Sequence, residues 1–314
     1  MAGKGAVLSL AVVIAVAGCG VAASAASPPA SHAASTAGWS SPPSPSMELP
    51  TESPSSAPTT SPSASPSPAS TVPAISRPPA PSPSPSNPPV TCPPGPSPAP
   101  GSGPAAPQYS SGVRTEKVIA LTIDDGESDA AVLADLAVLS SARVNATFFP
   151  IGANVERSPS VWRAVAAAGF PIGNHTYDHA NLTCLSEAAA VADLRHANAV
   201  VRSVTGTAPL AILRPPGGAT DLLVRQAAAA AGERAVVLWD VTLADTGRGG
   251  VDQLVVNGER ATSGSIVLMH ANGPLTQQAL PLLIDHYRAL GYGFVTVGQL
   301  LGVDGAVPYP TWPT

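Results

Sequence analysis

Two short stretches of the sequence carry side chains that could hold a metal ion and move protons. Asp124 and Asp125 stand side by side at the end of an apolar run in "LTIDDGES". His175 and His179 are four residues apart in "NHTYDH". On a helical turn, side chains at that spacing share one face and can reach one ion. Two imidazoles and one carboxylate suit zinc and leave a coordination position open for water.

Adjacent residues that leave a strand point in different directions, so the two aspartates can have different roles. We expect one to complete the metal site and the other to take a proton from the attacking water. The alternatives are an ordinary Asp-Gly turn and a pair of surface histidines. A metalloprotease is disfavoured, because its motif needs Glu directly after the first histidine, where Thr176 stands.

Two further stretches carry groups that a hydrolytic site needs. In "RPPGG", Arg214 lies beside a turn and could pair with a carboxylate and orient it. The backbone N–H of Gly217 in the same turn could stabilise an oxyanion. In "IVLMH", His270 ends an apolar run, a suitable place for a general acid. The alternatives are a plain turn with a surface arginine and a histidine satisfied in the core.

Short β-branched runs alternate with longer alanine-rich amphipathic runs after residue 117. We expect seven strands, at 118–123, 146–151, 171–173, 211–213, 235–239, 265–269 and 293–297. We expect six helices, at 129–141, 158–168, 186–205, 220–231, 251–261 and 275–290. This alternation predicts an α/β fold with a parallel sheet, either a barrel one unit short of the usual eight or an open doubly wound sheet.

The candidate residues all follow predicted strands, and Asp240 and Asp245 follow the fifth. The C-terminal strand ends of a barrel meet at one rim, where active sites lie. Scattered turn residues would show no such bias, so the pattern favours a site over unrelated turns.

Together these motifs resemble the polysaccharide deacetylases of carbohydrate esterase family 4, over about residues 115–302. The matching segments are Thr122–Gly126 (Thr-Phe-Asp-Asp-Gly), His175–His179 (His-Ser/Thr-x-x-His), Arg214–Gly218 (Arg-x-Pro-x-Gly) and Leu268–His270 (Leu-x-His). The resemblance implies a distorted (β/α)7 barrel. It also implies a metal-dependent hydrolase that removes acetyl groups from a polysaccharide.

The resemblance implies a role for each matching residue. The catalytic residues would be Asp124 as general base, Arg214 orienting it, His270 as general acid and Asp245 tuning that acid. The metal, Zn²⁺ or a similar divalent ion, would be bound by Asp125, His175 and His179. Leu268 would line the acetyl pocket, and Gly217 would supply the oxyanion contact.

Two departures from the family pattern bear on activity. The fourth motif, Asp-x-x-Asp-Trp, begins here with Thr242 and ends with Thr246, so only Asp245 is kept. The third motif has Gly217 where an aromatic residue is usual. We therefore expect a more open substrate groove. A non-catalytic glycan-binding module that keeps the barrel is the alternative function.

The first 25 residues are typical of an export signal. Lys4 precedes an apolar run at residues 6–17, which is too short to span a membrane. The run ends in "VAGC", which resembles a bacterial lipobox, so we expect cleavage before Cys19 and a lipid anchor there. Ordinary cleavage near Ala25 is the alternative. Either route predicts an exported protein, on the outer face of the cell membrane or secreted to the cell wall.

Residues 26–112 are predicted to be a disordered linker. Of the 37 prolines in the chain, 26 lie between Pro28 and Pro107, with few charged or apolar residues among them. The catalytic domain is expected at 113–303 and a tail at 304–314. If Cys19 carries lipid, Cys92 and Cys184 remain either as a disulfide or as two unrelated thiols.

The formal net charge of −5 offers no basic patch for nucleic acid. The expected partner is an acetylated polysaccharide. Peptidoglycan suits an anchored enzyme on a long spacer, and chitin-like glycans and acetylated xylan stay open.

Overall fold

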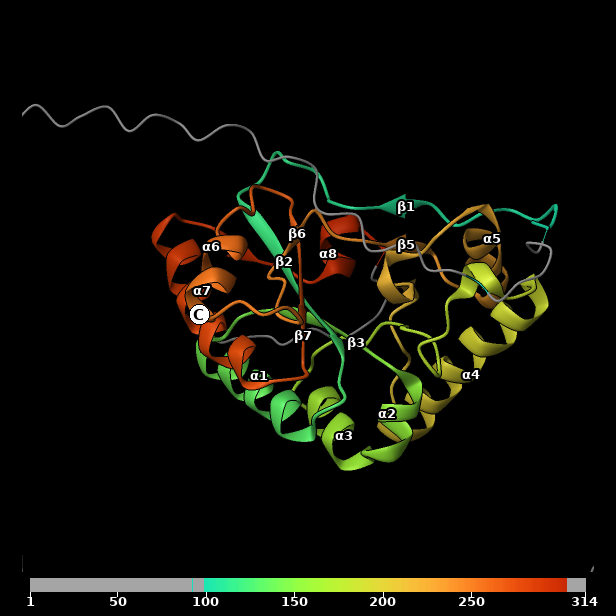
Figure 1. Cartoon of the computed structure of the whole chain (residues 1–314), viewed down its shortest axis with the longest axis horizontal. Coiled ribbons are helices and arrows are strands. Elements are labelled where there is room, and N and C mark those ends of the chain that lie inside the picture. The colour runs from blue at the N-terminus through green and yellow to red at the C-terminus, as the bar shows by residue number, and fades with distance from the viewer. Residues whose placement is uncertain (1–91, 93–98, 304–314) are drawn as a thin grey trace, which may run out of the picture. The chain divides into compact units, whose positions relative to one another are not determined.

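The computed structural model describes Cys92 and residues 99–303, in which the strands lie in the middle of the domain with helices around them (Figure 1). The strands are β1 Gln108–Tyr109, β2 Val118–Asp125, β3 Ala146–Pro150, β4 Ile212–Leu213, β5 Ala235–Val237, β6 Val241–Thr242, β7 Ile266–His270 and β8 Gly293–Phe294. The helices are α1 Asp129–Ala142, α2 Gly152–Arg157, α3 Pro159–Ala167, α4 Glu187–Thr205, α5 Leu222–Ala231, α6 Val251–Gly258, α7 Pro274–Ala289 and α8 Val297–Leu301. Two 3-10 turns are η1 Leu182–Cys184 and η2 Pro216–Gly218.

The pairings between named strands are parallel and run around a ring. Strands β3, β2, β7 and β6 pair in that order, and β4 pairs with β5. Single bridges from Phe148 to Ile172 and from Asn174 to Leu213 connect β3 to β4 through the intervening segment. Strands β5 and β6 are successive parts of one stretch, and β6 pairs with β7, so this stretch joins the two sheets without pairing β5 to β7. Strand β8 pairs with the start of β2. The predicted distorted barrel is confirmed.

Three predicted strands differ in detail from the structure. The one expected at 293–297 ends at Phe294, and Val297 begins α8. The segment at 171–173 is reduced to the two single bridges, and the predicted strand at 235–239 ends at Val237 before β6 begins. The barrel is distorted at these positions, where the hydrogen-bonded pairing between neighbouring strands is shortest.

Alternation along the strands separates the inside of the barrel from the layer under the helices. Ile119, Leu121 and Ile123 of β2 belong to the cluster that includes buried residues of α1, α3 and α7. The residues between them face the other way. A separate cluster takes residues from five strands: Ala120, Phe149, Ile212, Val237 and Ile266. We infer that this cluster is the barrel interior, and that the strand positions after it point to the rim.

Six predicted helices are confirmed, with ends that move by no more than three residues. The structure adds α2 and α8, at positions where no helix was expected. Helix α2 has no side-chain N-cap, and its first N–H groups, of Gly152 and Ala153, donate instead to the carbonyls of Thr176 and Tyr177. Tertiary contacts therefore replace the missing local capping signal.

The ordered domain begins earlier than the predicted boundary at residue 113. Strand β1 pairs with β5, and Ser111 forms a bridge to Ser265 beside β7. This segment therefore lies in the gap that β5 and β7 leave between them. Composition pointed to linker here, but the unpaired edge of β5 gives these residues backbone partners, so this part of the linker prediction was wrong. The rest of the predicted linker up to residue 91, with Cys19, and the tail from residue 304 lie outside the described residues.

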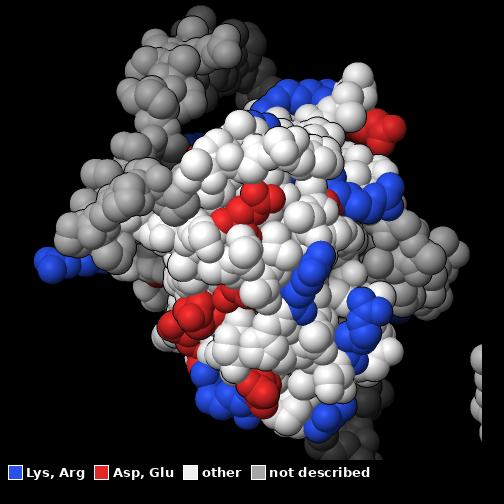
Figure 2. All heavy atoms as spheres, turned by 90° about the vertical axis from the view of Figure 1, so that its right-hand side faces the viewer, with Lys and Arg blue, Asp and Glu red and all other residues white. Residues whose placement is uncertain are grey.

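Within residues 99–303, no helix combines the length and apolar character needed to cross a membrane. Both acidic and basic side chains are exposed on the face at the α4–α5 end of the domain (Figure 2).

Candidate metal centre and active site

Asp124 lies at the C-terminal end of β2, on the inward side of the strand. Its Oδ1 accepts a hydrogen bond of 2.9 Å from Arg214 Nη1, which also donates to Thr122 Oγ1 at 2.6 Å. The guanidinium is fully buried, and its Nη2 donates to the carbonyl of Leu238. The predicted pairing of Arg214 with a carboxylate is confirmed, and the pair holds Asp124 as an oriented acceptor.

His270 lies opposite Asp124 on the neighbouring strand, since the β2–β7 register pairs the two residues. Its Nδ1 is 2.8 Å from Asp245 Oδ1, and its backbone N–H donates to Asp245 Oδ2 at 2.6 Å. Thr276 Oγ1 donates to the same carboxylate at 2.7 Å. Asp245 therefore orients the imidazole, as the sequence predicted, and leaves Nε2 as the ring nitrogen that can act on a ligand.

Asp125, His175 and His179 come together in a cluster whose ligand atoms all lie within 4.8 Å of one another. Asp125 Oδ1 is 3.3 Å from His175 Nε2 and 3.5 Å from His179 Nε2. This oxygen is buried and has no well-aligned hydrogen-bond donor among the described residues. A divalent cation between the three groups would satisfy it, so the donor set fits a metal ion.

The two histidines reach the site by a loop, not by the helical turn expected from their spacing. Thr176 and His179 both have φ of 63°, in the left-handed region that residues with a side chain rarely adopt. The imidazole rings nevertheless lie 5.1 Å apart. The prediction that they face one site is confirmed, but the helical reason for it was wrong.

His175 is fixed by its other ring nitrogen. Nδ1 lies 2.6 Å from the carbonyl of Arg214, so it carries the proton and leaves the Nε2 lone pair free toward Asp125. Arg214 thus holds Asp124 through its side chain and His175 through its backbone carbonyl.

The protonation of these groups follows from their neighbours. Burial opposes ionisation of Asp125, but the close imidazole of His175 and the amide of Asn272 outweigh it and lower its pKa. Burial and the nearby His175 lower the pKa of His179, which favours the neutral ligand form. Burial also opposes charge on His270, yet its hydrogen bond and ion pair with Asp245 raise its pKa to about 9. His270 is therefore held as an acid.

None of the sequence motifs indicated the buried network beneath His175. Asn174 Nδ2 donates to Glu233 Oε1 at 3.0 Å, and Asn198 Nδ2 donates to the same oxygen at 2.8 Å. Asn174 Oδ1 accepts from the backbone N–H of Thr176. Burial raises the pKa of Glu233 to about 7, although both amide hydrogen bonds oppose the shift. Only position in the fold identifies these residues, because each looks like an ordinary helix or turn residue in sequence.

The remaining predicted site residues lie near the rim with fewer contacts. Leu268 is buried two residues before His270, on the same side of β7. Gly217 is exposed in η2, with φ of 60°. A cavity of about 160 Å³ lies beside the general acid and is lined by residues that include Asp245, Thr246, His270, Asn272 and Leu275. It lies where the fourth-motif tryptophan is replaced by Thr246, in agreement with the expected open groove.

Asp240 does not belong to the site, although it follows a predicted strand. It pairs with Arg114 at 2.8 Å and accepts hydrogen bonds from Ser265 Oγ and the backbone N–H of Ile266. Its carboxylate therefore joins the start of the domain to β7, which is a structural role.

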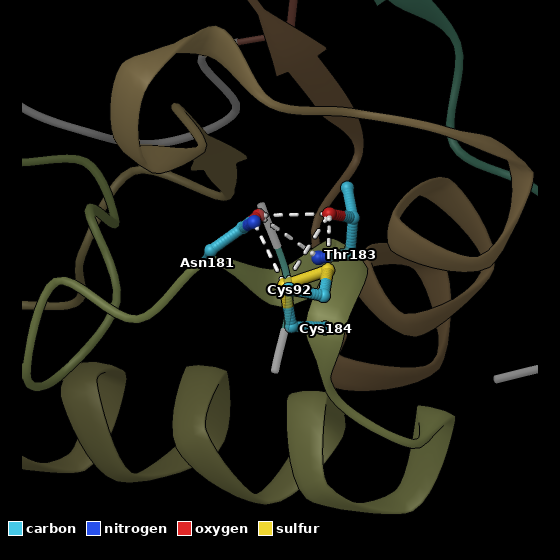
Figure 3. The surroundings of a disulfide bond; sticks show 4 residues. All are labelled: Cys92, Asn181, Thr183 and Cys184. Atoms are coloured by element: carbon cyan, nitrogen blue, oxygen red, sulfur yellow. Dashed lines mark hydrogen bonds between the residues drawn. A yellow bond between two sulfur atoms is a disulfide. The ribbon is translucent and has the colours of Figure 1, made fainter. Parts of the chain in front are cut away.

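The disulfide between Cys92 and Cys184 is formed, which resolves the alternative left open by the sequence (Figure 3). Cys184 ends η1, five residues after His179 of the candidate metal cluster. Asn181 caps this turn by accepting from the backbone N–H of Thr183, and its Nδ2 is 2.9 Å from Cys184 Sγ. The disulfide thus ties the end of the metal-binding loop to the segment before the domain.

Comparison with known proteins agrees with this geometry. Residues 111–236 match the family model described as polysaccharide deacetylase. A peptidoglycan-N-acetylglucosamine deacetylase of Bacillus cereus is 34% identical over 191 residues, which cover 59% of this chain and 89% of that protein. One of Listeria monocytogenes is 33% identical over 192 residues, 60% of this chain but only 40% of the relative's length.

A solved structure shares the fold. It is a pseudoenzyme of carbohydrate esterase family 4 from Bacillus anthracis, with a TM-score of 0.59 and 26% identity, covering 62% of this chain and 68% of that chain. The sequence matches, the barrel and the arrangement of its rim residues lead to one assignment: this chain belongs to the polysaccharide deacetylases of carbohydrate esterase family 4.

Proposed function

We propose that this chain is a metal-dependent deacetylase that hydrolyses acetamide groups on an N-acetylglucosamine-containing glycan. The observation that carries the proposal is the placement of two oriented proton-transfer groups, Asp124 with Arg214 and His270 with Asp245, on adjacent strands beside the Asp125–His175–His179 cluster. The two bacterial relatives, both named as peptidoglycan-N-acetylglucosamine deacetylases, support the substrate class.

The proposed cofactor is Zn²⁺. When bound, a divalent ion of this kind would polarise the acetyl carbonyl and lower the pKa of water. Two imidazoles with one carboxylate are the ligand set of many catalytic zinc sites. Neutral His179 and ionised Asp125 are the forms needed for ligation.

In the proposed reaction, Asp124 accepts a proton from the water that attacks the carbonyl carbon. His270 donates a proton to the amide nitrogen, so that the C–N bond breaks and acetate and a free amine leave. Arg214 keeps Asp124 aimed at the water. We assign the backbone N–H of Gly217 to the oxyanion and Leu268 to the acetyl methyl group.

A non-catalytic glycan-binding module is the second candidate. The loss of Trp at Thr246 favours it, and a structural neighbour titled a pseudoenzyme shows that this fold alone does not ensure activity. The retained base, acid and ligand cluster favour an enzyme.

Acetate release from peptidoglycan, chito-oligosaccharides and acetylated xylan separates the two candidates. We expect release from one or both N-acetylated glycans, lost with a chelator and restored by Zn²⁺. A catalytic control is Asp124→Asn, and a metal control is His175→Ala with His179→Ala, which should lose stoichiometric metal and keep the fold. Glycan binding without acetate release in any condition would support the binding module.

We also propose export and a lipid anchor on Cys19, from the signal-like start of the sequence. Membrane fractionation of wild-type cells and of a Cys19→Ala strain tests this. Loss of membrane association in the variant supports the anchor, and a wild-type protein found only in the medium with its N-terminus near Ala26 contradicts it.

A further inference from the structure

Asn272 contacts the metal cluster although none of the sequence motifs includes it. It lies two residues beyond His270, where the chain leaves β7. Its Nδ2 donates to Asp125 Oδ2 at 2.9 Å. The backbone N–H of Ala271 donates to the carbonyl of Asp124 at 3.2 Å, which holds this part of the chain across the end of β2.

The two oxygens of Asp125 have different surroundings. Oδ1 faces the imidazole nitrogens of His175 and His179, at 3.3 and 3.5 Å. Oδ2 faces the amide of Asn272. The terminal torsion of an aspartate is broad, so the backbone alone does not decide how the carboxylate plane is turned. A hydrogen-bond donor held against one of the two oxygens does fix how the carboxylate plane is turned.

The orientation of the Asn272 amide is itself set by Asp125. If the amide were turned over, its oxygen would face a carboxylate oxygen, and two acceptors would repel each other. In the observed orientation Asn272 Oδ1 is buried and has no hydrogen-bond partner among the described residues. The side chain thus leaves its own oxygen unsatisfied while it donates to Asp125, which indicates that the donation to Asp125 is the dominant interaction.

We propose that Asn272 is a positioning residue that turns the Asp125 carboxylate so that Oδ1 is presented to a divalent cation held with His175 and His179. The inference rests on the proposed metal site. It also means that the end of β7 and the two residues after it supply both the proposed general acid, His270, and the support for the metal ligand Asp125.

Direct titration with Zn²⁺ against a chromogenic chelator tests the role without any glycan substrate. Asn272→Leu keeps the approximate shape and removes the donor, and Asn272→Ala removes both. Loss of a hydrogen bond to a metal ligand typically weakens metal affinity by about 10–100-fold, and we expect this range for both variants. Asn145→Ala is a matched control, because Asn145 is also half-buried and donates to a backbone carbonyl, that of Phe294, away from the cluster.

The unfolding temperature of each variant is measured without metal and again with Zn²⁺. An unchanged temperature without metal and a smaller rise with Zn²⁺ would show that the substitution weakens the metal-bound state only. Zinc affinity within twofold of wild type in both Asn272 variants would overturn the proposal. A drop in Asn145→Ala equal to that in the Asn272 variants would also overturn it, since the effect would then be general. If wild-type protein itself binds no zinc, the proposed function fails first.

Discussion

The proposed base and the proposed metal ligands reach the same rim by different means. Asp124 and Arg214 lie inside the barrel, where strand alternation points both side chains inward and burial leaves them 3% and 0% exposed. His179 lies in a loop with a left-handed backbone and a side chain that is 45% exposed. From this comparison we expect the barrel interior to fix the proton-transfer geometry and the strained loop to set how tightly a metal ion is held.

The largest effect should come from separating the two adjacent aspartates. Asp124→Asn keeps the shape of the side chain but cannot accept a proton, so kcat should fall by about 10²–10⁴-fold with metal still bound. Asp125→Asn should weaken metal binding, because a neutral amide oxygen is a poorer ligand. Metal content and acetate release are measured together at increasing Zn²⁺. Excess zinc should restore activity only in Asp125→Asn, and the reverse pattern would mean that the roles are exchanged.

The next effect tests how far the barrel interior depends on its buried ion pair. Arg214→Ala leaves Asp124 buried without its cation, which typically costs about 3–5 kcal/mol of stability. We expect that loss in denaturant unfolding and a fall in kcat smaller than that of Asp124→Asn. Zinc affinity should change less than stability or kcat. A loss of zinc affinity as large as in Asp125→Asn would mean that Arg214 supports the metal ligands and not the base.

The role of the loop that carries His179 is tested through the disulfide near its end. Replacing Cys92 and Cys184 together by serine removes a cross-link between residues 92 apart, and native disulfides typically contribute about 2–4 kcal/mol. We expect a lower unfolding temperature and weaker zinc binding, since the cross-link ends five residues after His179. Unchanged zinc affinity with a lower unfolding temperature would show that the disulfide stabilises the domain but not the loop.

The smallest effect concerns the pH at which activity declines. The pKa of His270, raised to about 9 by Asp245, keeps the acid protonated below that pH, so activity should fall as pH rises through its pKa. Asp245→Asn removes the negative charge, and the pKa should move down toward the ordinary value of about 6.5. The alkaline limb of the kcat/KM profile should therefore shift to lower pH by about 1–2 units, whereas an unmoved limb would assign it to another group.

Sequence patterns predicted the parts that depend on local periodicity. The strand that ends in Asp124 and Asp125 reads as an apolar run because it is buried on both faces in a parallel sheet. Five of the six confirmed helices, α3 to α7, show amphipathic periods of the same local origin. Motif spacing pointed to two histidines, an aspartate and an arginine at one rim, since strand ends in a barrel converge, and the family resemblance added the choice of Asp125 and the pairing of Asp245 with His270.

Only the tertiary structure decided the features whose partners are distant in the chain. The left-handed loop at Thr176 and His179 depends on Asn174, Glu233 and the first turn of α2, and no residue near the histidines signals it. Strand β1 is ordered because β5 offers an unpaired edge, although its own composition favours a linker. Asn272 became part of the site because the register of β7 against β2 brings its amide to Asp125. Local sequence determines which elements form, whereas hydrogen bonds between separate elements determine how the polar side chains at their ends are turned.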